Sequence, residues 1–116
     1  MSRIIVEASS SYLAEDTVKA LLKSGFVANS ARISYNPSRG LPPFEDTDKY
    51  PLILEGKLGF SSVHIHVTSV TAGYGGTGPN AMVDILKAAG FKFEESDILT
   101  NKLADSDDQI ELTYTR

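Results

Sequence analysis

The middle of the chain carries the pattern that most limits its possible folds. "SSVHIHVTSVTA" (61–72) alternates apolar with polar side chains, as a strand with one buried face does. A glycine-rich segment follows at 73–78, and "PNAMVDILKAAG" (79–90) then places apolar residues at helical spacing. We expect Pro79 at the first helical position and Gly90 as the C-terminal cap. A strand, a tight turn and a helix in direct succession predict a sheet with a helix packed on one face.

The N-terminal third repeats this combination. "RIIVEA" (3–8) predicts a buried strand, and "SSYLAEDTVKALLKSG" (10–25) predicts a helix capped by Gly25. "FVANSARISY" (26–35) predicts a second strand, with one face formed by Val27, Ala31, Ile33 and Tyr35. Residues 36–51 contain four of the five prolines and show no periodicity, which predicts a long proline-rich surface loop.

The remaining segments add short strands. "LILEGKLGF" (52–60) predicts a hairpin turning at Glu55–Gly56, "FKFEE" (91–95) a strand, and "QIELTYT" (109–115) a closing strand. The sequence therefore predicts a single α+β domain over residues 1–116. We expect a mixed sheet of about five or six strands with two helices packed on one face.

The net charge of −4 arises wholly in the second half of the chain. Residues 1–58 hold seven acidic and seven basic side chains, whereas residues 59–116 hold eight acidic and four basic ones. No basic stripe is present, so we expect no duplex nucleic acid as a partner, because phosphate contacts dominate that affinity. The first apolar run ends at Glu7 and cysteine is absent. This predicts a cytoplasmic protein without a signal peptide or membrane span.

The glycine-rich segment is the main candidate for a binding site. "GYGGTG" satisfies G-x-G-x-x-G after a predicted strand and before a predicted helix. Too few residues follow to complete a dinucleotide-binding domain, so we expect no dinucleotide cofactor. Two interpretations remain: a tight turn that only packs the helix, or an open backbone that a phosphate approaches. The second interpretation assigns ligand contacts to a stacking ring and its neighbours: Tyr74, Gly75, Gly76, Thr77, Gly78 and Asn80.

Two side chains outside that segment are candidates to complete the site. His64 and His66 project to one side of the predicted strand. That strand leads into the glycine-rich segment, so we assign His66 a ligand contact, the alternative being a plain polar sheet face. Arg39, in the proline-rich loop, supplies positive charge to an anion. The histidine spacing suits two metal ligands, but the chain offers no further histidine and no cysteine as a third, so we expect no metal.

The segment "AGYGGTGPNAMVDIL" (72–86) resembles part of small uncharacterised phage and bacterial proteins. In those proteins Gly-Tyr-Gly-Gly-Ser-Gly-Pro leads into an apolar helix, which corresponds here to 73–79 and the helix from about Asn80 to Leu86. Ala72 stands where a tryptophan is common, and Thr77 where serine is usual. The resemblance implies a viral or mobile-element setting, in which small acidic proteins often inhibit host defence, and thus the host cytoplasm.

Three hypotheses follow for the function. The first is a noncatalytic binding protein for a small anionic, nucleotide-like ligand, acting as a phage-type sponge that sequesters a host defence signal. Because the second half of the chain is acidic, the counter-charge comes from the first half or from another subunit, so we expect a homo-oligomer.

The second hypothesis is an acidic inhibitor or adaptor of a host protein, with a purely structural glycine loop. Its charge would come from acidic residues such as Asp105, Asp107 and Asp108. The third hypothesis is a small nucleotide-processing enzyme. No serine–histidine–acid or paired-carboxylate spacing is present, so we assign no catalytic residue.

Overall fold

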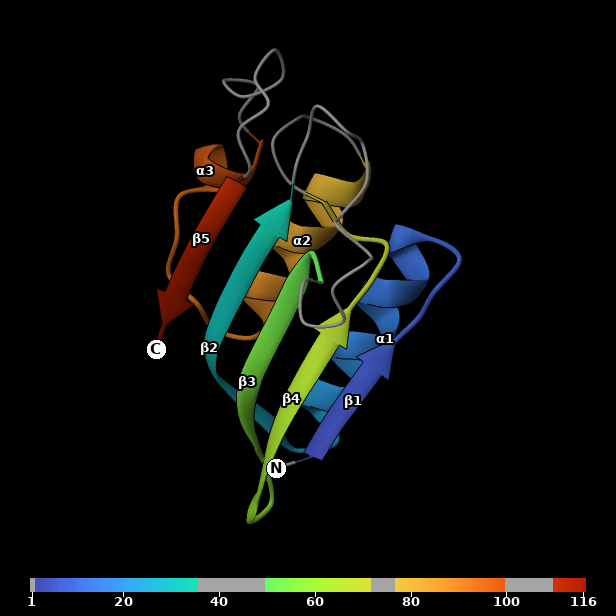
Figure 1. Cartoon of the computed structure of the whole chain (residues 1–116), viewed down its shortest axis with the longest axis vertical. Coiled ribbons are helices and arrows are strands. Elements are labelled where there is room, and N and C mark those ends of the chain that lie inside the picture. The colour runs from blue at the N-terminus through green and yellow to red at the C-terminus, as the bar shows by residue number, and fades with distance from the viewer. Residues whose placement is uncertain (1, 36–49, 72–76, 100–109) are drawn as a thin grey trace.

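The computed structural model of the chain describes residues 2–35, 50–71, 77–99 and 110–116 (Figure 1). Along these ranges the elements are, in order, β1 (Ser2–Val6), α1 (Ser11–Lys23), β2 (Phe26–Tyr35), β3 (Leu52–Leu58), β4 (Ser61–Val67), α2 (Thr77–Ala88), α3 (Glu95–Leu99) and β5 (Ile110–Thr115). The strands lie in one sheet, in the order β1-β4-β3-β2-β5. β1 runs parallel to β4, and the other neighbouring pairs are antiparallel.

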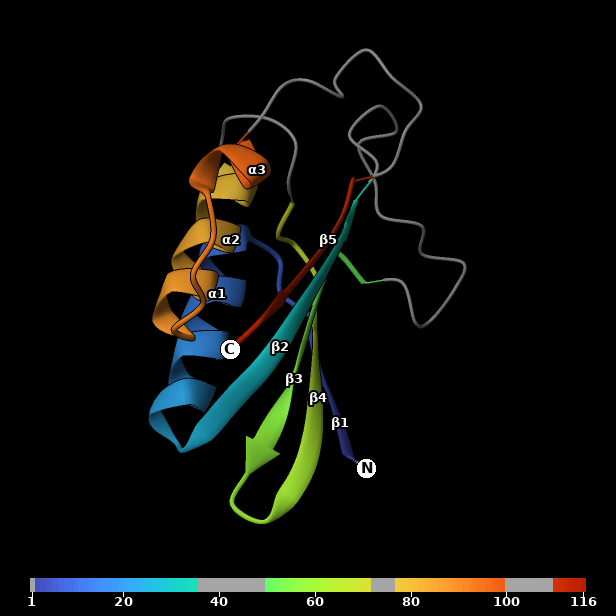
Figure 2. The ribbon, with the colours of Figure 1, turned by 90° about the vertical axis from the view of Figure 1, so that its left-hand side faces the viewer.

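Both long helices cover the same face of this mixed sheet (Figure 2). The connection from β1 through α1 to β2 crosses β4 and β3, because those two strands lie between β1 and β2. α1 and α2 lie beside each other in the helix layer, and α3 packs on α2. The predicted α+β fold, a mixed sheet of about five or six strands with two helices on one face, is confirmed: the sheet has five strands, and the short helix α3 is an addition. No helix in the described ranges combines the length and apolar character needed to span a membrane.

Local sequence signals explain where α1 begins and ends. The Ser10 side chain accepts a hydrogen bond from the Leu13 amide at 3.2 Å, which caps the first turn. Gly25 has a φ of +110°, which glycine adopts without strain, so the predicted cap is confirmed. The buried side chains of α1 are Ala14 and Val18. The helix packs on the core through these two side chains and the partly buried Leu21 and Leu22.

The core lies between the helices and the sheet. Val63, Ile65 and Val67 alternate along β4 and are at most 3% exposed, so the alternation predicted for this strand is confirmed. They belong to one apolar cluster with the buried side chains of α2. β1, predicted to be buried, is instead an edge strand: Val6 is buried, but Ile5 is 42% exposed.

Residues 52–58 form one continuous strand, so the hairpin predicted to turn at Glu55–Gly56 is wrong. The turn between β3 and β4 lies at Gly59–Phe60, the segment that joins the two strands. Gly56 has a different use, because a Cβ atom at this position would lie 1.9 Å from the Val27 carbonyl oxygen. Glycine here allows the close approach of two backbones rather than a reversal of the chain.

A β-bulge changes the face pattern of β2. The register of β2 against β3 shifts directly after Ala28. Of the predicted face, Ala31 and Ile33 are buried, and the side chain of Tyr35 lies outside the described part of the chain. Val27 is 52% exposed, contrary to the prediction, because the extra residue of a bulge reverses the alternation of side chains.

Residues 91–94 form no strand, so the strand predicted over 91–95 is wrong. The Phe91 amide donates to the Leu86 carbonyl at 3.1 Å, and Gly90 has a φ of +88°, which together form a Schellman-type helix end. The Gly90 cap is therefore confirmed. This turn directs Phe91 into the core, where it is 6% exposed. The chain then returns along the helix layer to α3 (Figure 2).

Replacing Gly56 by alanine should destabilise the fold, because the added Cβ would overlap the Val27 carbonyl oxygen. We expect the free energy of unfolding to fall by about 3 kcal/mol, the upper end for overpacking, as measured by urea denaturation. Gly59→Asn is the matched control: Gly59 has a φ of +64° and open space around its Cβ position, and asparagine tolerates that backbone. Equal unfolding midpoints for the two variants would contradict this role of Gly56.

Tyr114 connects β5 to the chain around α3. Its hydroxyl donates to the Asp97 carboxylate at 3.3 Å, and its ring centroid lies 5.7 Å from that of Phe93. Burial, followed by the negative charge of Asp97, raises the pKa of Tyr114 to about 12. The neutral hydroxyl is therefore the form that the folded state favours.

We expect an absorbance titration to show a tyrosine phase at about pH 12, and Tyr114→Phe to remove that phase. The folded-state pKa lies above the ordinary tyrosine pKa of 10.0. The contribution of Tyr114 to stability is thus complete below pH 10 and is lost as the pH rises through 12. Persistence of the late phase in Tyr114→Phe would assign it to another tyrosine.

Candidate functional site

The carboxyl ends of β1 and β4 bring two strand-to-helix connections together. The two strands are parallel neighbours, with Val6 paired to Val67 at their ends. The chain leaves β1 for α1 and β4 for α2, so both helices begin at this end of the sheet (Figure 1). The positive dipole ends of two helices therefore lie in one region. This region adjoins the carboxyl ends of parallel strands, where ligands bind in open α/β sheets.

Hydrogen bonds hold these two connections against each other. Thr68, the residue after β4, donates to the Val6 carbonyl twice, through its amide at 3.0 Å and its hydroxyl at 2.9 Å. The Ser69 hydroxyl donates to the Ala8 carbonyl, and the Ser69 carbonyl accepts from the Ser11 hydroxyl at 2.6 Å. We call the side chains of Ser11, Thr68 and Ser69 the hydroxyl rim.

Ser69 has an unusual backbone conformation. Its φ is +65°, the one positive value at a non-glycine residue in the part of the chain that the structure describes. The left-handed conformation costs about 1–2 kcal/mol for such a residue, and strained positions of this kind cluster at functional sites. The hydrogen bonds of Ser69 hold this conformation, so the path of the chain out of β4 is set before the glycine-rich segment begins.

Thr77 and Asn80 are exposed at the start of α2. Thr77 is the first residue of the helix, and Asn80 lies on the same turn. Gly78 and Pro79 between them are buried, and Pro79 is third in the helix rather than first. Proline is tolerated there, because the first-turn N–H groups have no partner within the helix. Four residues of the predicted site lie outside the described ranges: Tyr74, Gly75, Gly76 and Arg39.

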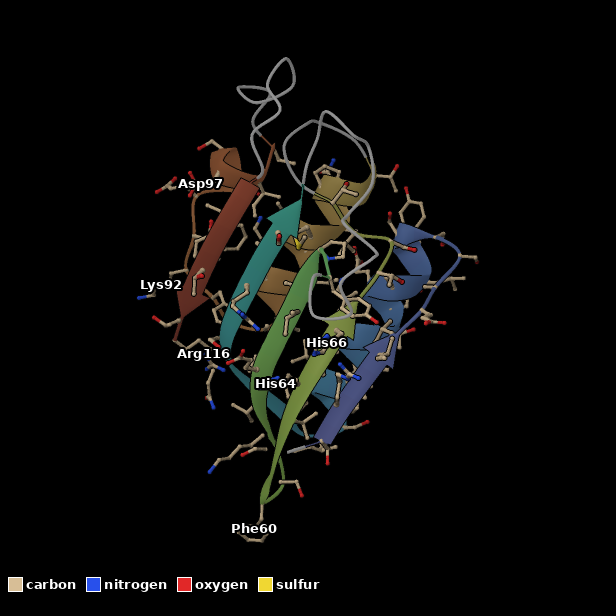
Figure 3. All side chains as sticks on the ribbon, viewed as in Figure 1. Phe60, His64, His66, Lys92, Asp97 and Arg116 are labelled. Atoms are coloured by element: carbon tan, nitrogen blue, oxygen red, sulfur yellow. The ribbon has the colours of Figure 1, made fainter. Side chains whose placement is uncertain are left out.

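His66 lies on the opposite face of the sheet from α2. As predicted, it shares that face with His64 (Figure 3), while Ile65 between them points into the core. His66 is 3% exposed, its ring meets that of Tyr50 edge-on at 4.9 Å, and it stacks with His64 at 6.2 Å. The sheet therefore separates His66 from the start of α2. Among the described residues, no three His, Asp or Glu side chains are grouped so that they could hold a metal ion.

Sequence reasoning missed the hydroxyl rim, although a signal for it was present. Three serines at 9–11 and a threonine–serine pair at 68–69 follow the two strands. Hydroxyl residues are common in loops, so neither run is specific by itself. Only the pairing of β1 with β4 brings Ser11 to Ser69, which are 58 residues apart in the chain. The acidic residues of the inhibitor hypothesis, Asp105, Asp107 and Asp108, lie outside the described ranges.

No protein-family model, curated protein or solved structure matches this chain.

Ser69→Gly should be more stable than Ser69→Ala, although alanine usually stabilises a folded protein more than glycine does. Both remove the hydroxyl that donates to the Ala8 carbonyl, but only glycine adopts a φ of +65° without strain. We expect the glycine variant to be more stable by roughly 1 kcal/mol, measured by urea denaturation at neutral pH. An alanine variant as stable as the glycine variant would show that the backbone at Ser69 is unstrained.

Proposed function

We propose that this protein is a noncatalytic binding protein for a small anionic, nucleotide-like ligand. The phosphate of the ligand lies at the common start of α1 and α2, against the first turn of α2. One observation carries the proposal: the hydrogen-bonded, left-handed backbone of Ser69, at the point where the two connections leave the parallel strands. A small domain maintains such strain where a site has to be held in place.

The donors at this end of the sheet suit an anion. The hydroxyls of the rim already donate to backbone carbonyls, so their role is to hold the two connections together. The Thr77 hydroxyl and the first-turn amides of α2 are the donors that we assign to the ligand, with the positive dipole ends of both helices behind them. The glycines of segment 73–78 add open backbone by their sequence, and Tyr74 adds a ring that stacks on a base or sugar.

The negative charge of the second half of the chain is the reason that we propose a homo-oligomer. A phosphate near α2 enters the half that holds the excess negative charge, so its counter-charge has to come from Arg39 or from a second subunit. We therefore place the site near an interface in a homo-oligomer. In the viral setting that the resemblance implies, binding without turnover sequesters a host defence signal.

Thermal unfolding with a panel of nucleotides, cyclic dinucleotides and ADP-ribose derivatives tests this proposal. A ligand at 100 times its Kd adds about 2.7 kcal/mol of stability, which raises the midpoint by roughly 10 °C for a domain of this size. The absence of a shift across the whole panel would overturn the proposal. Chemical conversion of a bound nucleotide during incubation would favour a small enzyme instead.

Thr77→Asp distinguishes an effect on ligand binding from an effect on the stability of the fold. A carboxylate at the start of α2 favours the helix dipole by about 0.5 kcal/mol but repels an anion. We expect unchanged or higher stability without nucleotide, and no midpoint shift with it. Thr77→Asn is the matched neutral control and should keep most of the shift. A full shift in Thr77→Asp would place the ligand away from the start of α2.

A further inference from the structure

β1 forms one edge of the sheet, because β4 is its one strand neighbour within the described ranges. Two hydrogen bonds show which backbone groups of this segment are directed toward β4. The Val6 carbonyl accepts from the Thr68 amide at 3.0 Å. The Ala8 amide donates to the Thr68 hydroxyl oxygen at 3.4 Å. Successive residues of a strand direct their N–H and C=O groups to opposite sides, so Glu7, between these two residues, directs its groups away from β4.

The same alternation applies to Arg3 and Ile5, which lie two and four residues before Glu7. All three direct their amides and carbonyls to the outer side of β1, where a further strand would add to the sheet. Their side chains also share one face, because every second residue of a strand does. All three side chains are exposed, Ile5 by 42%. We call these three residues the outer edge of β1.

The outer edge of β1 is complementary to a second copy of itself. Arg3 and Glu7 lie at equal distances on either side of Ile5. When two copies pair antiparallel with Ile5 opposite Ile5, Arg3 of each copy lies opposite Glu7 of the other. Every one of these pairs joins residues whose backbone groups point outward, so each is of the type that exchanges both N–H···O=C bonds. Opposite charges placed directly across two strands stabilise such a pairing.

The charges also select this register over its neighbours. A shift by one residue would place an outward-directed backbone opposite an inward-directed one, and the hydrogen bonds could not form. A shift by two residues places either Arg3 or Glu7 opposite Ile5, so both pairs of opposite charge are lost. The register centred on Ile5 is therefore the one that satisfies the backbone and the charges together.

The helix beside β1 would meet its own copy in this arrangement. α1 lies at the β1 side of the helix layer, with α2 on its other flank (Figure 1). The two-fold axis of an antiparallel strand pair is perpendicular to the sheet, so the helices of both copies lie on the same side of the extended sheet. The flank of α1 that points away from α2 then faces the same flank of the second copy.

That flank of α1 is uncharged. Hydrogen bonding to Glu15, followed by nearby negative charges that include Asp84 of α2, raises the pKa of Lys19, so Lys19 lies on the flank toward α2. Helical spacing places four exposed residues on the opposite flank: Leu13, Thr17, Ala20 and Ser24. The Thr17 and Ser24 hydroxyls donate to carbonyls of their own helix at 2.7 and 2.9 Å. They therefore need no further partner when a second helix covers them.

We propose that two copies of this chain associate through the outer edges of β1, in an antiparallel pairing centred on Ile5, with the uncharged flanks of α1 in contact. The two sheets become continuous, and the exposed Ile5 side chains lie beside each other across the two-fold axis. The same residues contribute from both copies, so the contact closes at two copies. This interface supplies the homo-oligomer of the proposed function, but the inference rests on β1 and α1 alone and needs no ligand.

Sedimentation velocity without nucleotide, at protein concentrations from about 1 μM to 1 mM, tests the proposal. We expect a dimer that dissociates on dilution. Arg3→Glu places a glutamate opposite Glu7 in both symmetric pairs, and should weaken dimerisation roughly 30-fold. A monomer throughout this range, or assembly that continues beyond two copies, would overturn the proposal.

The double variant Arg3→Glu, Glu7→Arg tests the register. It restores opposite charges in both pairs, so its Kd should return to within about threefold of that of the unmodified protein. Lys92→Glu is the matched control for the single charge reversal, because Lys92 is exposed and lies on the β5 side of the molecule (Figure 3). It should dimerise normally. A double variant as weak as Arg3→Glu, or an equal loss in Lys92→Glu, would contradict the pairing.

Amide hydrogen exchange distinguishes strand pairing from any other dimer. Exchange at the Ile5 amide should slow as the protein concentration rises, because this amide is directed toward the second copy. The Val6 residue is directed toward β4, and its amide should be protected at every concentration. A dimer in which the Ile5 amide exchanges at the monomer rate would place the interface elsewhere.

The dimer and the ligand site are tested separately. Thr77→Asp should dimerise as the unmodified protein does, because Thr77 belongs to α2 and not to the outer edge of β1. The absence of a nucleotide midpoint shift would overturn the ligand proposal and leave the sedimentation result unchanged. A monomer that binds nucleotide would overturn the interface alone.

Discussion

The parallel pairing of β1 with β4 is the interaction on which the rest of the structure depends. It joins two strands that are far apart in the sequence, for example at the pair Ile4 and Ile65. Parallel neighbours require a connection that crosses over one face of the sheet, and here that connection includes α1. α2 follows β4 on the same side, so both long helices pack on one face of the sheet. The proposed site at the start of α2 is a consequence of this pairing.

The two faces of the sheet differ in their polar groups. At the start of α2 a positive potential comes from backbone amides and helix dipoles, which act over a short range and suit one phosphate. On the opposite face of the sheet, the Arg32 and His64 side chains instead lie beside the Glu55 carboxylate. The sheet lies between these two sets of polar groups.

Several predictions from sequence were correct because they rested on local or periodic signals. The alternation of Val63, Ile65 and Val67 shows that one side of β4 is buried. Gly25 and Gly90 follow helices, where a positive φ is needed, and both have one. The turn predicted at Gly56 was wrong because a glycine in the sequence is compatible both with a turn and with the close approach of two backbones.

The strand predicted at 91–95 failed for a different reason. Phe91 and Phe93 alternate with polar residues as a strand would, but Phe91 follows a Schellman-type helix end and packs in the core between the layers. Phe93 meets the Tyr114 ring at 5.7 Å, so its apolar contact is with β5 rather than within a new strand. Alternation reports which side chains are buried, not which element buries them.

The sequence by itself determined the α+β layering, the helix caps and the candidate glycine-rich segment, because these depend on periodic burial and on the backbone freedom of single residues. Only the tertiary structure decided that Ser11 meets Ser69 and that Arg32 and His64 share Glu55. These contacts join residues from distant parts of the chain. They depend on strand order and register, which periodicity along one segment does not encode.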